Sequence, residues 1–462
     1  MSPENKTNPP TIYQYTSRTE IENWQKCKRA YFFRKVYGGR GIVPSFASVP
    51  LATGSAIHKG VETIAMQILT GKPVDITLAI KAGKEYYAKE VGEKLLSETL
   101  SERQAYVKRE QSALIAALIR VWHKVELPRL LAEYKIRQSE QSLAFNLSDK
   151  KRIRFMSKAD LTLESLETSE PYIYSLKTVK EWTPRAEASY NTDLQGLTES
   201  MGAMFQRKEW NNRRAGAIRE IKARYKAGEL DKEQALVQIG QVPGELIEQV
   251  MGVRFCFLVK GKRWPLYGPD GEIQGKWTDS PFLYGYRRQG PGEIEYAHSD
   301  KVYKPENKSG FGKLGKGWEK FSVYDGGEAS KAVGGIKGWV EMLASGELQP
   351  ELDNPLQMGV ITPVPRFPHR EELESALVQI KSEAEVAEES RQRWLVDQSS
   401  TTLDREYPQT RRNCHWPTDC DYLYACYKAS PGQDLLDPMS PYEERKPHHD
   451  VEEFEEEEMR DN

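Results

Sequence analysis

Two short apolar runs separated by a polar segment constrain the fold of this chain more than any other feature. Residues 153–163 and 172–176 are rich in β-branched and aromatic side chains, and residues 164–171 between them are polar and turn-like. This pattern predicts a β-hairpin. The first strand carries Asp160 and the second ends on Lys177, so the two side chains share one face if the register places them there.

An aspartate and a lysine on adjacent strands suit metal-assisted hydrolysis. The carboxylate can hold a divalent cation, and the lysine can orient or deprotonate the attacking water. For the hairpin alone, the alternative is an exposed Asp160 and an exposed Lys177 without a catalytic role. Features elsewhere in the chain favour the catalytic interpretation.

Four further features accompany the hairpin. An aromatic-rich segment follows an early cysteine, a histidine lies in a small-residue helix start, a glutamine lies on the helix after Lys177, and three cysteines cluster near the C-terminus. These residues are Cys27, His58, Gln195, Cys414, Cys420 and Cys426. In this order they resemble the PD-(D/E)XK nucleases, in the branch that contains RecB, AddB and the CRISPR-associated RecB-like exonucleases.

The resemblance implies both a fold and an activity. The fold would be α/β, a mixed central β-sheet flanked by helices as in restriction endonucleases, with helical and Gly-rich insertions. The activity would be a DNA exonuclease in recombination, repair or phage DNA metabolism. His58 and Asp160 would hold Mg²⁺ or Mn²⁺, Lys177 would position water, and Gln195 would orient Lys177 or the substrate strand. The family commonly carries a glutamate on the preceding strand, where this chain has Glu140.

One position departs from the family pattern. The acid–x–Lys tripeptide is here Ser-Leu-Lys, so Ser175 replaces a metal-binding carboxylate. Losing an anionic ligand weakens a site for a hard divalent cation. Some restriction endonucleases of this fold have Ser-x-Lys and take the acid from the following helix, where this chain has Glu199, one turn from Gln195. Either Glu199 is a catalytic metal ligand in place of the strand acid, or the protein is an inactive, nucleic-acid-binding scaffold.

The cysteines indicate a second metal site. Cys414, Cys420 and Cys426 have a C-x5-C-x5-C spacing, which is too open for the tight pairs of common zinc modules. The resemblance supplies Cys27 as the fourth ligand of a [4Fe–4S] cluster that would join the N-terminal helix to the C-terminal segment. Zinc in the same thiolates is the alternative. Cys256 lies in an apolar strand and is expected to be a buried core residue.

A basic segment follows the predicted core. Between residues 207 and 226 there are eight basic residues and two acidic ones, with aromatic side chains among them. Basic charge interleaved with aromatic rings suits contacts to phosphates and stacked bases, and a solvated helix face is the alternative. The candidate nucleic-acid-binding residues are Arg213, Arg214, Arg219 and Lys222.

Local patterns predict the individual elements. Ser17 and Glu20 fit a capping box, which predicts a helix over residues 17–37. A second helix is expected over residues 55–69, with His58 in its first turn. A third is expected over residues 186–205, and a charged helix over 371–396. Further strands of the core sheet are expected over residues 139–147, 251–259 and 280–288.

These patterns divide the chain into six parts. A disordered lead-in precedes the N-terminal helices and nuclease core, an inserted basic helical arm follows, and the remaining core strands come next with a Gly-rich insertion and a charged helix. A cysteine cluster and an acidic disordered tail end the chain. The corresponding ranges are 1–15, 16–205, 206–249, 250–398, 399–430 and 431–462.

Composition limits the partners and the compartment. The formal net charge is −2, so a nucleic-acid footprint must be a local patch rather than a global excess. No apolar run approaches the roughly 20 residues of a membrane span, and the N-terminus lacks the pattern of a signal peptide. We therefore expect a cytoplasmic protein. The resemblance to the PD-(D/E)XK nucleases implies single-stranded DNA or duplex ends as its partner. Because the chain has no ATPase motif, we expect unwinding to come from a helicase or recombinase partner.

Overall fold

The computed structural model describes most of the chain. All structural statements below concern residues 14–45, 49–95, 102–179, 194–247, 249–259, 283–290, 293–298, 319–322, 359–363, 365–410, 414, 420–427, 434–437 and 440–445.

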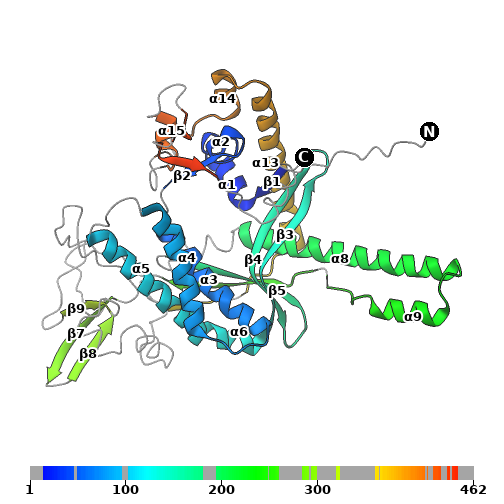
Figure 1. Ribbon diagram of the computed structural model, residues 1–462, viewed down its shortest axis with the longest axis horizontal. Coiled ribbons are helices and arrows are strands. Elements are labelled where there is room, and N and C mark those ends of the chain that lie inside the picture. The colour runs from blue at the N-terminus through cyan, green and yellow to red at the C-terminus, as the bar shows by residue number, and fades with distance from the viewer. Residues whose placement is uncertain are drawn as a thin grey trace.

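A six-stranded mixed sheet lies at the centre of the fold (Figure 1). Its strands follow the order β1-β4-β5-β6-β10, and β3 pairs with β4 outside this path. The β1/β4 and β5/β6 pairs are parallel, whereas the β3/β4, β4/β5 and β6/β10 pairs are antiparallel. The strands are β1 (Gln14–Ser17), β3 (Tyr134–Ser148), β4 (Ile153–Ser165), β5 (Pro171–Val179), β6 (Gly252–Val259) and β10 (Gly359–Ile361). The predicted mixed α/β fold and the β4/β5 hairpin are both confirmed.

Helices cover both faces of this sheet because its strands alternate apolar side chains between two cores. Tyr174 packs with the helices that precede the sheet, whereas its neighbour Ile173 packs with Ala203 of α8. On β6, Cys256 is fully buried in the first core and Phe255 in the second, as consecutive strand residues require. The helices of the first face are α3 (Val49–Leu69), α4 (Ile76–Leu95), α5 (Glu102–Val121), the π-helical turn η2 (Trp122–Glu126) and α6 (Leu127–Glu133).

The N-terminal helices differ from the prediction in two ways. The expected helix over residues 17–37 is broken at Cys27, whose extended backbone (φ −162°, ψ 110°) separates α1 (Arg18–Lys26) from α2 (Lys28–Lys35). Ser17 caps α1 by accepting a hydrogen bond from the Glu20 N–H at 3.4 Å. Helix α3 begins at Val49 rather than at residue 55. Pro50 lies in its first turn, where a proline does not interrupt a helix. His58 therefore lies in the middle of α3, not in its first turn.

Residues 280–288 were predicted to form a strand of the core sheet, and this prediction is wrong. Strand β7 (Leu283–Gly290) pairs with β8 (Glu293–His298) and β9 (Glu319–Ser322) in a separate three-stranded sheet. Pairing with the next strand along the chain closes a short loop, which costs less entropy than docking on the distant core. The outer place beside β6 belongs instead to β10, from the segment predicted to be Gly-rich and irregular.

Helix α8 joins the core to the arm without interruption. It runs from Leu194 to Lys226, and α9 (Lys232–Gln241) returns beside it, so the arm projects from the body in Figure 1. The predicted boundary between residues 205 and 206 therefore falls inside one helix. Residues 186–193 of the helix predicted over 186–205 lie outside the described residues.

The two ends of the chain pack together through an aromatic core. Trp24 and Phe32, from α1 and α2, contact Tyr407 with ring centroids 6.0 and 5.0 Å apart, and Tyr422 stacks on Tyr442. The buried Arg29 donates a 2.8 Å hydrogen bond to the Tyr407 carbonyl. The C-terminal helices involved are α13 (Arg370–Val396), α14 (Ser400–Glu406) and α15 (Leu423–Tyr427).

Some residues at each end of the chain that were predicted to be disordered form strands. Gln14 and Tyr15, assigned to the lead-in, form part of β1 and pair with β4. Residues Tyr442–Glu444, assigned to the tail, form β11 and pair with β2 (Ile42–Pro44). Burial of the Tyr442 ring in the aromatic core explains why this short strand is ordered despite its acidic surroundings. The rest of the predicted tail, from residue 446, lies outside the described residues.

Candidate active site

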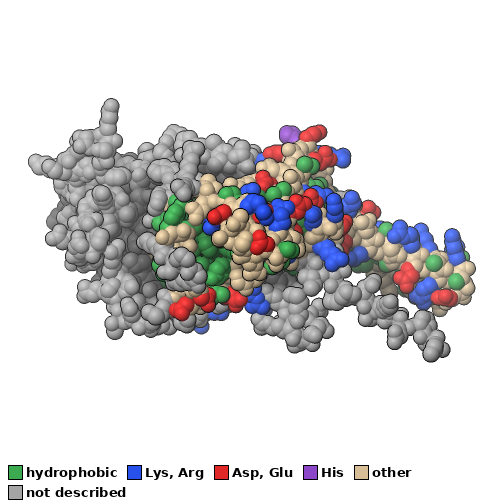
Figure 2. Space-filling model, turned by 90° about the horizontal axis from the view of Figure 1, so that it is seen from above, with side chains coloured by type: hydrophobic (Ala, Val, Ile, Leu, Met, Phe, Trp, Pro, Cys, Tyr) green, Lys and Arg blue, Asp and Glu red, His purple; other side chains and the backbone are tan. Residues whose placement is uncertain are grey.

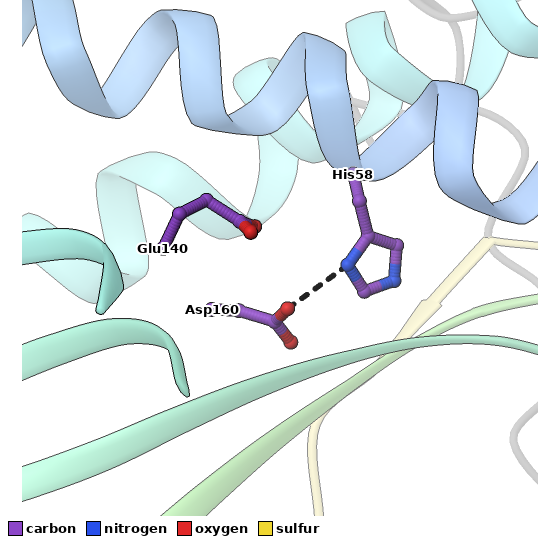
Figure 3. A group of neighbouring side chains, drawn as sticks. All are labelled: His58, Glu140 and Asp160. Carbon is purple, nitrogen blue, oxygen red and sulfur yellow. Dashed lines mark hydrogen bonds and ion pairs between the residues drawn. The ribbon is translucent and has the colours of Figure 1, made fainter. Parts of the chain in front are cut away.

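Three side chains with metal-ligating atoms converge between helix α3 and strands β3 and β4. They are His58, Glu140 and Asp160, and their donor atoms lie within 4.8 Å of one another (Figure 3). His58 Nδ1 and Asp160 Oδ1 are 3.0 Å apart. In the described part of the chain, no other group of three or more potential ligands meets this spacing.

Strand pairing places the two carboxylates opposite each other. The pairs Gln141–Ala159 and Ser139–Leu161 bracket Glu140 and Asp160 in the β3/β4 ladder. Glu140 has a left-handed backbone with φ 53°, which is uncommon for a residue other than glycine, and such strain concentrates at functional sites. On the other side, the Leu176 N–H donates a 2.6 Å hydrogen bond to Asp160 Oδ2 and fixes that carboxylate against β5.

Asp160 and His58 stabilise each other's charged forms. Burial alone would raise the pKa of Asp160, but the His58 charge and hydrogen bond, Lys177 and the Leu176 N–H together lower it. Burial would likewise lower the pKa of His58, but Asp160 outweighs it and the net shift is upward. Their side chains keep 28% and 18% exposure. The pair is therefore open to an entering ion on one side.

Glu140 lies in a less favourable environment for its charge. Burial raises its pKa, and the Asp160 carboxylate adds to that shift, while Lys158 opposes it. The Lys158 ammonium reaches Glu140 at 2.6 Å. A cation between the two carboxylates would relieve their repulsion, so the charge distribution of this group fits a divalent metal.

The residues around Ser175 form a second, buried layer behind this group. Gln195 donates to the Ser175 hydroxyl at 3.4 Å and to Glu199 Oε1 at 2.5 Å. Glu199 is 1% exposed, and its Oε2 has no hydrogen-bond partner. Burial raises the pKa of Glu199 to about 8, against the opposing charge of Lys177. In the metal-free protein, this carboxyl is therefore protonated near neutral pH.

Lys177 lies between the two layers. Its positive charge lowers the pKa of His58, of Asp160 and of Glu199. The predicted catalytic set of Asp160, Lys177, Gln195 and Glu199 thus comes from β4, β5 and α8 and meets around one point.

The predicted metal-ligand set does not converge in full. Glu199 lies outside the group formed by His58 and Asp160, and Glu140 takes the third place. Sequence analysis noted Glu140 as the family's strand glutamate but did not assign it to the metal. The missed signal was its position opposite Asp160 in the β3/β4 pairing.

The four predicted cluster cysteines occupy one neighbourhood. Cys27 lies in the break between α1 and α2, and its sulfur accepts a 3.5 Å hydrogen bond from the Thr410 N–H. The Cys420 N–H donates to the Cys414 carbonyl at 2.8 Å. Burial raises the pKa of the Cys426 thiol to about 12, and the charges of the other three cysteines add to that shift. The four side chains thus influence one another across the junction of the two chain ends.

The predicted DNA-binding residues of the arm have different roles in the structure. Arg213 pairs with Glu209, and Arg214 donates a 2.9 Å hydrogen bond to the Pro243 carbonyl. Arg219 and Lys222 are exposed. Figure 2 shows that Lys and Arg side chains recur along the projecting arm.

Comparison with known proteins agrees with this geometry. Residues 15–231 match the family model of the PD-(D/E)XK nuclease superfamily. The match covers a little under half of the 462 residues and includes the whole candidate site and strands β3, β4 and β5, whereas β6 and β10 lie beyond it. No curated protein matches the chain. None of the helices that the structure describes combines the length and apolarity needed to cross a bilayer.

The raised pKa of Glu199 predicts a pH-dependent stability difference. Because the folded protein holds this proton up to about pH 8, wild-type stability falls as pH rises from about 4.5 toward 8. Glu199→Gln has no such titration. In EDTA, the free energy of unfolding of Glu199→Gln should equal that of wild type at pH 5. At pH 9 it should be higher than that of wild type by about 3–5 kcal/mol. Chemical unfolding at both pH values measures the difference, and a pH-independent difference would show that Glu199 is ionised in the fold.

Proposed function

We propose that this chain is a metal-dependent nuclease that hydrolyses phosphodiester bonds in DNA. The observation that carries the proposal is the group of His58, Glu140 and Asp160, with Lys177 beside it, in a segment similar to PD-(D/E)XK nucleases. One imidazole nitrogen and two carboxylates suit Mn²⁺ and also Mg²⁺. When bound, the ion would supply Lewis-acid stabilisation of the charge that develops on the phosphate.

The protein side chains have separate roles in this proposal. Asp160 is held by the Leu176 N–H and kept anionic by its lowered pKa, so it is ready to receive a cation. His58 would release its proton on ligation, as metal ligands must. Lys177 would hold and orient the attacking water in line with the scissile bond, and Gln195 would fix the layer behind it through Ser175.

Glu199 is proposed to supply the acid that Ser175 lacks. Gln195 contacts both residues, so the Glu199 carboxyl lies close to the strand position where the family has its acid. Its unpartnered Oε2 and raised pKa describe a buried carboxyl without a cation. Ligation would then require Glu199 to lose its proton.

The alternative is an inactive nuclease fold that binds nucleic acid as a scaffold. The favouring observation is the same Glu199, because a carboxyl protonated near neutral pH leaves the site one anion short. In either case the arm would provide phosphate contacts through residues such as Arg219 and Lys222. A helicase or recombinase partner would supply unwinding, and exonuclease action on DNA ends is the preferred mode.

We also propose a [4Fe–4S] cluster at Cys27, Cys414, Cys420 and Cys426. The support is the neighbourhood that the four cysteines share and the C-x5-C-x5-C spacing of the last three, which is too open for the tight pairs of common zinc modules. Zinc in the same thiolates is the alternative. Cys420 and Cys426 pack against the aromatic core between the chain ends.

The first test is cleavage. Wild type should degrade end-labelled single-stranded or duplex DNA with Mg²⁺ or Mn²⁺, and Asp160→Asn should reduce the rate by at least about a thousandfold, because it removes a charged ligand. DNA affinity in EDTA should change by less than about threefold, since phosphate contacts dominate binding. Glu164→Gln, on the same strand, is the matched control. Asp160→Asn cleaving at the wild-type rate would contradict the proposal.

The role of Glu199 is tested by moving the carboxylate. Glu199→Ala should lose cleavage as fully as Asp160→Asn, and the double variant Ser175→Asp with Glu199→Ala should recover part of it by restoring an anion on β5. The readout is the single-turnover cleavage rate. An active wild type whose Glu199→Ala variant cuts normally rules out the replacement. An inactive wild type supports the scaffold alternative.

The cluster is tested by metal content. Protein purified without oxygen should be brown and contain about four irons per chain. Substituting Cys27 by Ala should remove the colour and lower the unfolding temperature, because one of four ligands is lost. Cys256→Ala should keep the iron, since that thiol is buried in the sheet core. If wild type contained zinc and no iron, the site would be a zinc site rather than a cluster. If the Cys27 variant kept its full metal content, Cys27 would not share a metal site with the other three cysteines.

A further inference from the structure

A cleft lies between the base of the arm and the β3/β4 strand pair. Its volume is about 510 Å³, within the range of small-ligand pockets. Side chains of β3 and β4 form one wall and α8 the other, and Leu246 closes the outer end. No residue assigned to the metal site contributes to this lining.

The outer wall of the cleft is held in place by the arm itself. Side chains of α8 bind the backbone of residues 243–247 where the chain returns from α9. Asn211 exchanges two hydrogen bonds with the Leu246 backbone, at 2.8 and 2.9 Å. Arg207 donates to the Ile247 carbonyl at 3.1 Å, and the Trp210 indole N–H donates to the Gly244 carbonyl at 3.3 Å. The cleft is therefore a preformed feature of the fold.

The lining combines the chemical groups that recognise a nucleotide. The lining contains three arginines, Arg154, Arg207 and Arg213, and one carboxylate, Glu209, which pairs with Arg213. Trp210 presents an aromatic ring that is 41% exposed although its N–H is anchored. Guanidinium groups suit a phosphate, and an exposed indole face suits a stacked base.

The cleft and the candidate metal group use neighbouring residues of the same strands. Gln141 of its lining directly follows Glu140 on β3, and Thr162 lies two residues after Asp160 on β4. Consecutive side chains of a strand point to opposite faces of the sheet. Gln141 donates a hydrogen bond to Gln206 of α8, whereas Glu140 lies with His58 of α3, so the cleft and the candidate metal ligands share β3 but use its opposite faces.

We propose that this cleft binds one unpaired nucleotide of the substrate strand, on the α8 side of the strand pair that carries the candidate metal ligands. The inference rests on the proposed nuclease function and narrows its substrate to DNA that is single-stranded at this position. A base inside a duplex has no free face for Trp210, because its neighbours are stacked on it. A duplex would therefore contact the exposed arm but leave the cleft empty.

Binding without cleavage tests the cleft. In EDTA, fluorescence anisotropy gives the affinity for a ten-nucleotide thymidine oligomer and for a blunt duplex. Trp210→Ala should weaken single-strand binding about tenfold, within the range for one stacked base, and leave duplex binding within about twofold. Tyr225→Ala is the matched control, an exposed aromatic on the same helix that does not line the cleft.

A conservative variant distinguishes stacking by the Trp210 ring from the hydrogen bond by which Trp210 holds the backbone at Gly244. Trp210→Phe keeps an aromatic face but loses the hydrogen bond to Gly244, so it should retain most of the single-strand affinity. The proposal would be overturned if Trp210→Ala lost equal affinity for the single strand and the duplex. It would also be overturned if Trp210→Ala and Tyr225→Ala lost equal affinity for the single strand. Trp210→Phe binding as weakly as Trp210→Ala would also overturn stacking. Because no metal is present, a protein that binds as predicted but never cuts would refute the nuclease and leave the cleft intact.

Discussion

The hydrogen bond from the Leu176 N–H to Asp160 Oδ2 is the interaction on which the candidate site depends. It links β4 to β5 at the point where the strands bring Asp160 and Lys177 together, and it supports the lowered pKa of Asp160. His58 reaches the other carboxylate oxygen from α3. Each face of the sheet thus contributes to one position, because α3 packs on the first core and α8, with Gln195 and Glu199, on the second.

The site separates its charged groups by burial. His58 and Asp160 are partly exposed and stabilise each other as ions, whereas Glu199 is buried and its pKa rises to about 8. One layer is therefore ready for a cation, and the other carries a carboxyl that must lose a proton before it can join. This division leaves a buried carboxyl near Ser175, at the strand position where PD-(D/E)XK nucleases carry an acid.

Sequence analysis predicted the elements whose patterns are long and regular. The hairpin carrying Asp160 and Lys177 was predicted from two runs of β-branched and aromatic residues, strand β6 from an apolar run, and helix α13 from a long charged segment. It failed for β10, which has only three residues, and for β7, which pairs locally. It also missed the order at Tyr442, which stacks on Tyr422 and pairs with β2 near the other end of the chain. Glu140 was noted but not assigned to the metal, because its position opposite Asp160 depends on the register of β3 and β4, which no local pattern gives. Its left-handed backbone is likewise not indicated by any propensity.

Direct measurement of metal binding tests the central claim that His58, Glu140 and Asp160 form a metal centre. Calorimetric titration of wild type with Mn²⁺ at pH 7 should show one site, and comparison of buffers with different ionisation enthalpies should show proton release on binding. Asp160→Asn should abolish the site, while Glu164→Gln should leave it unchanged. Equal Mn²⁺ affinity in wild type and Asp160→Asn would contradict the account.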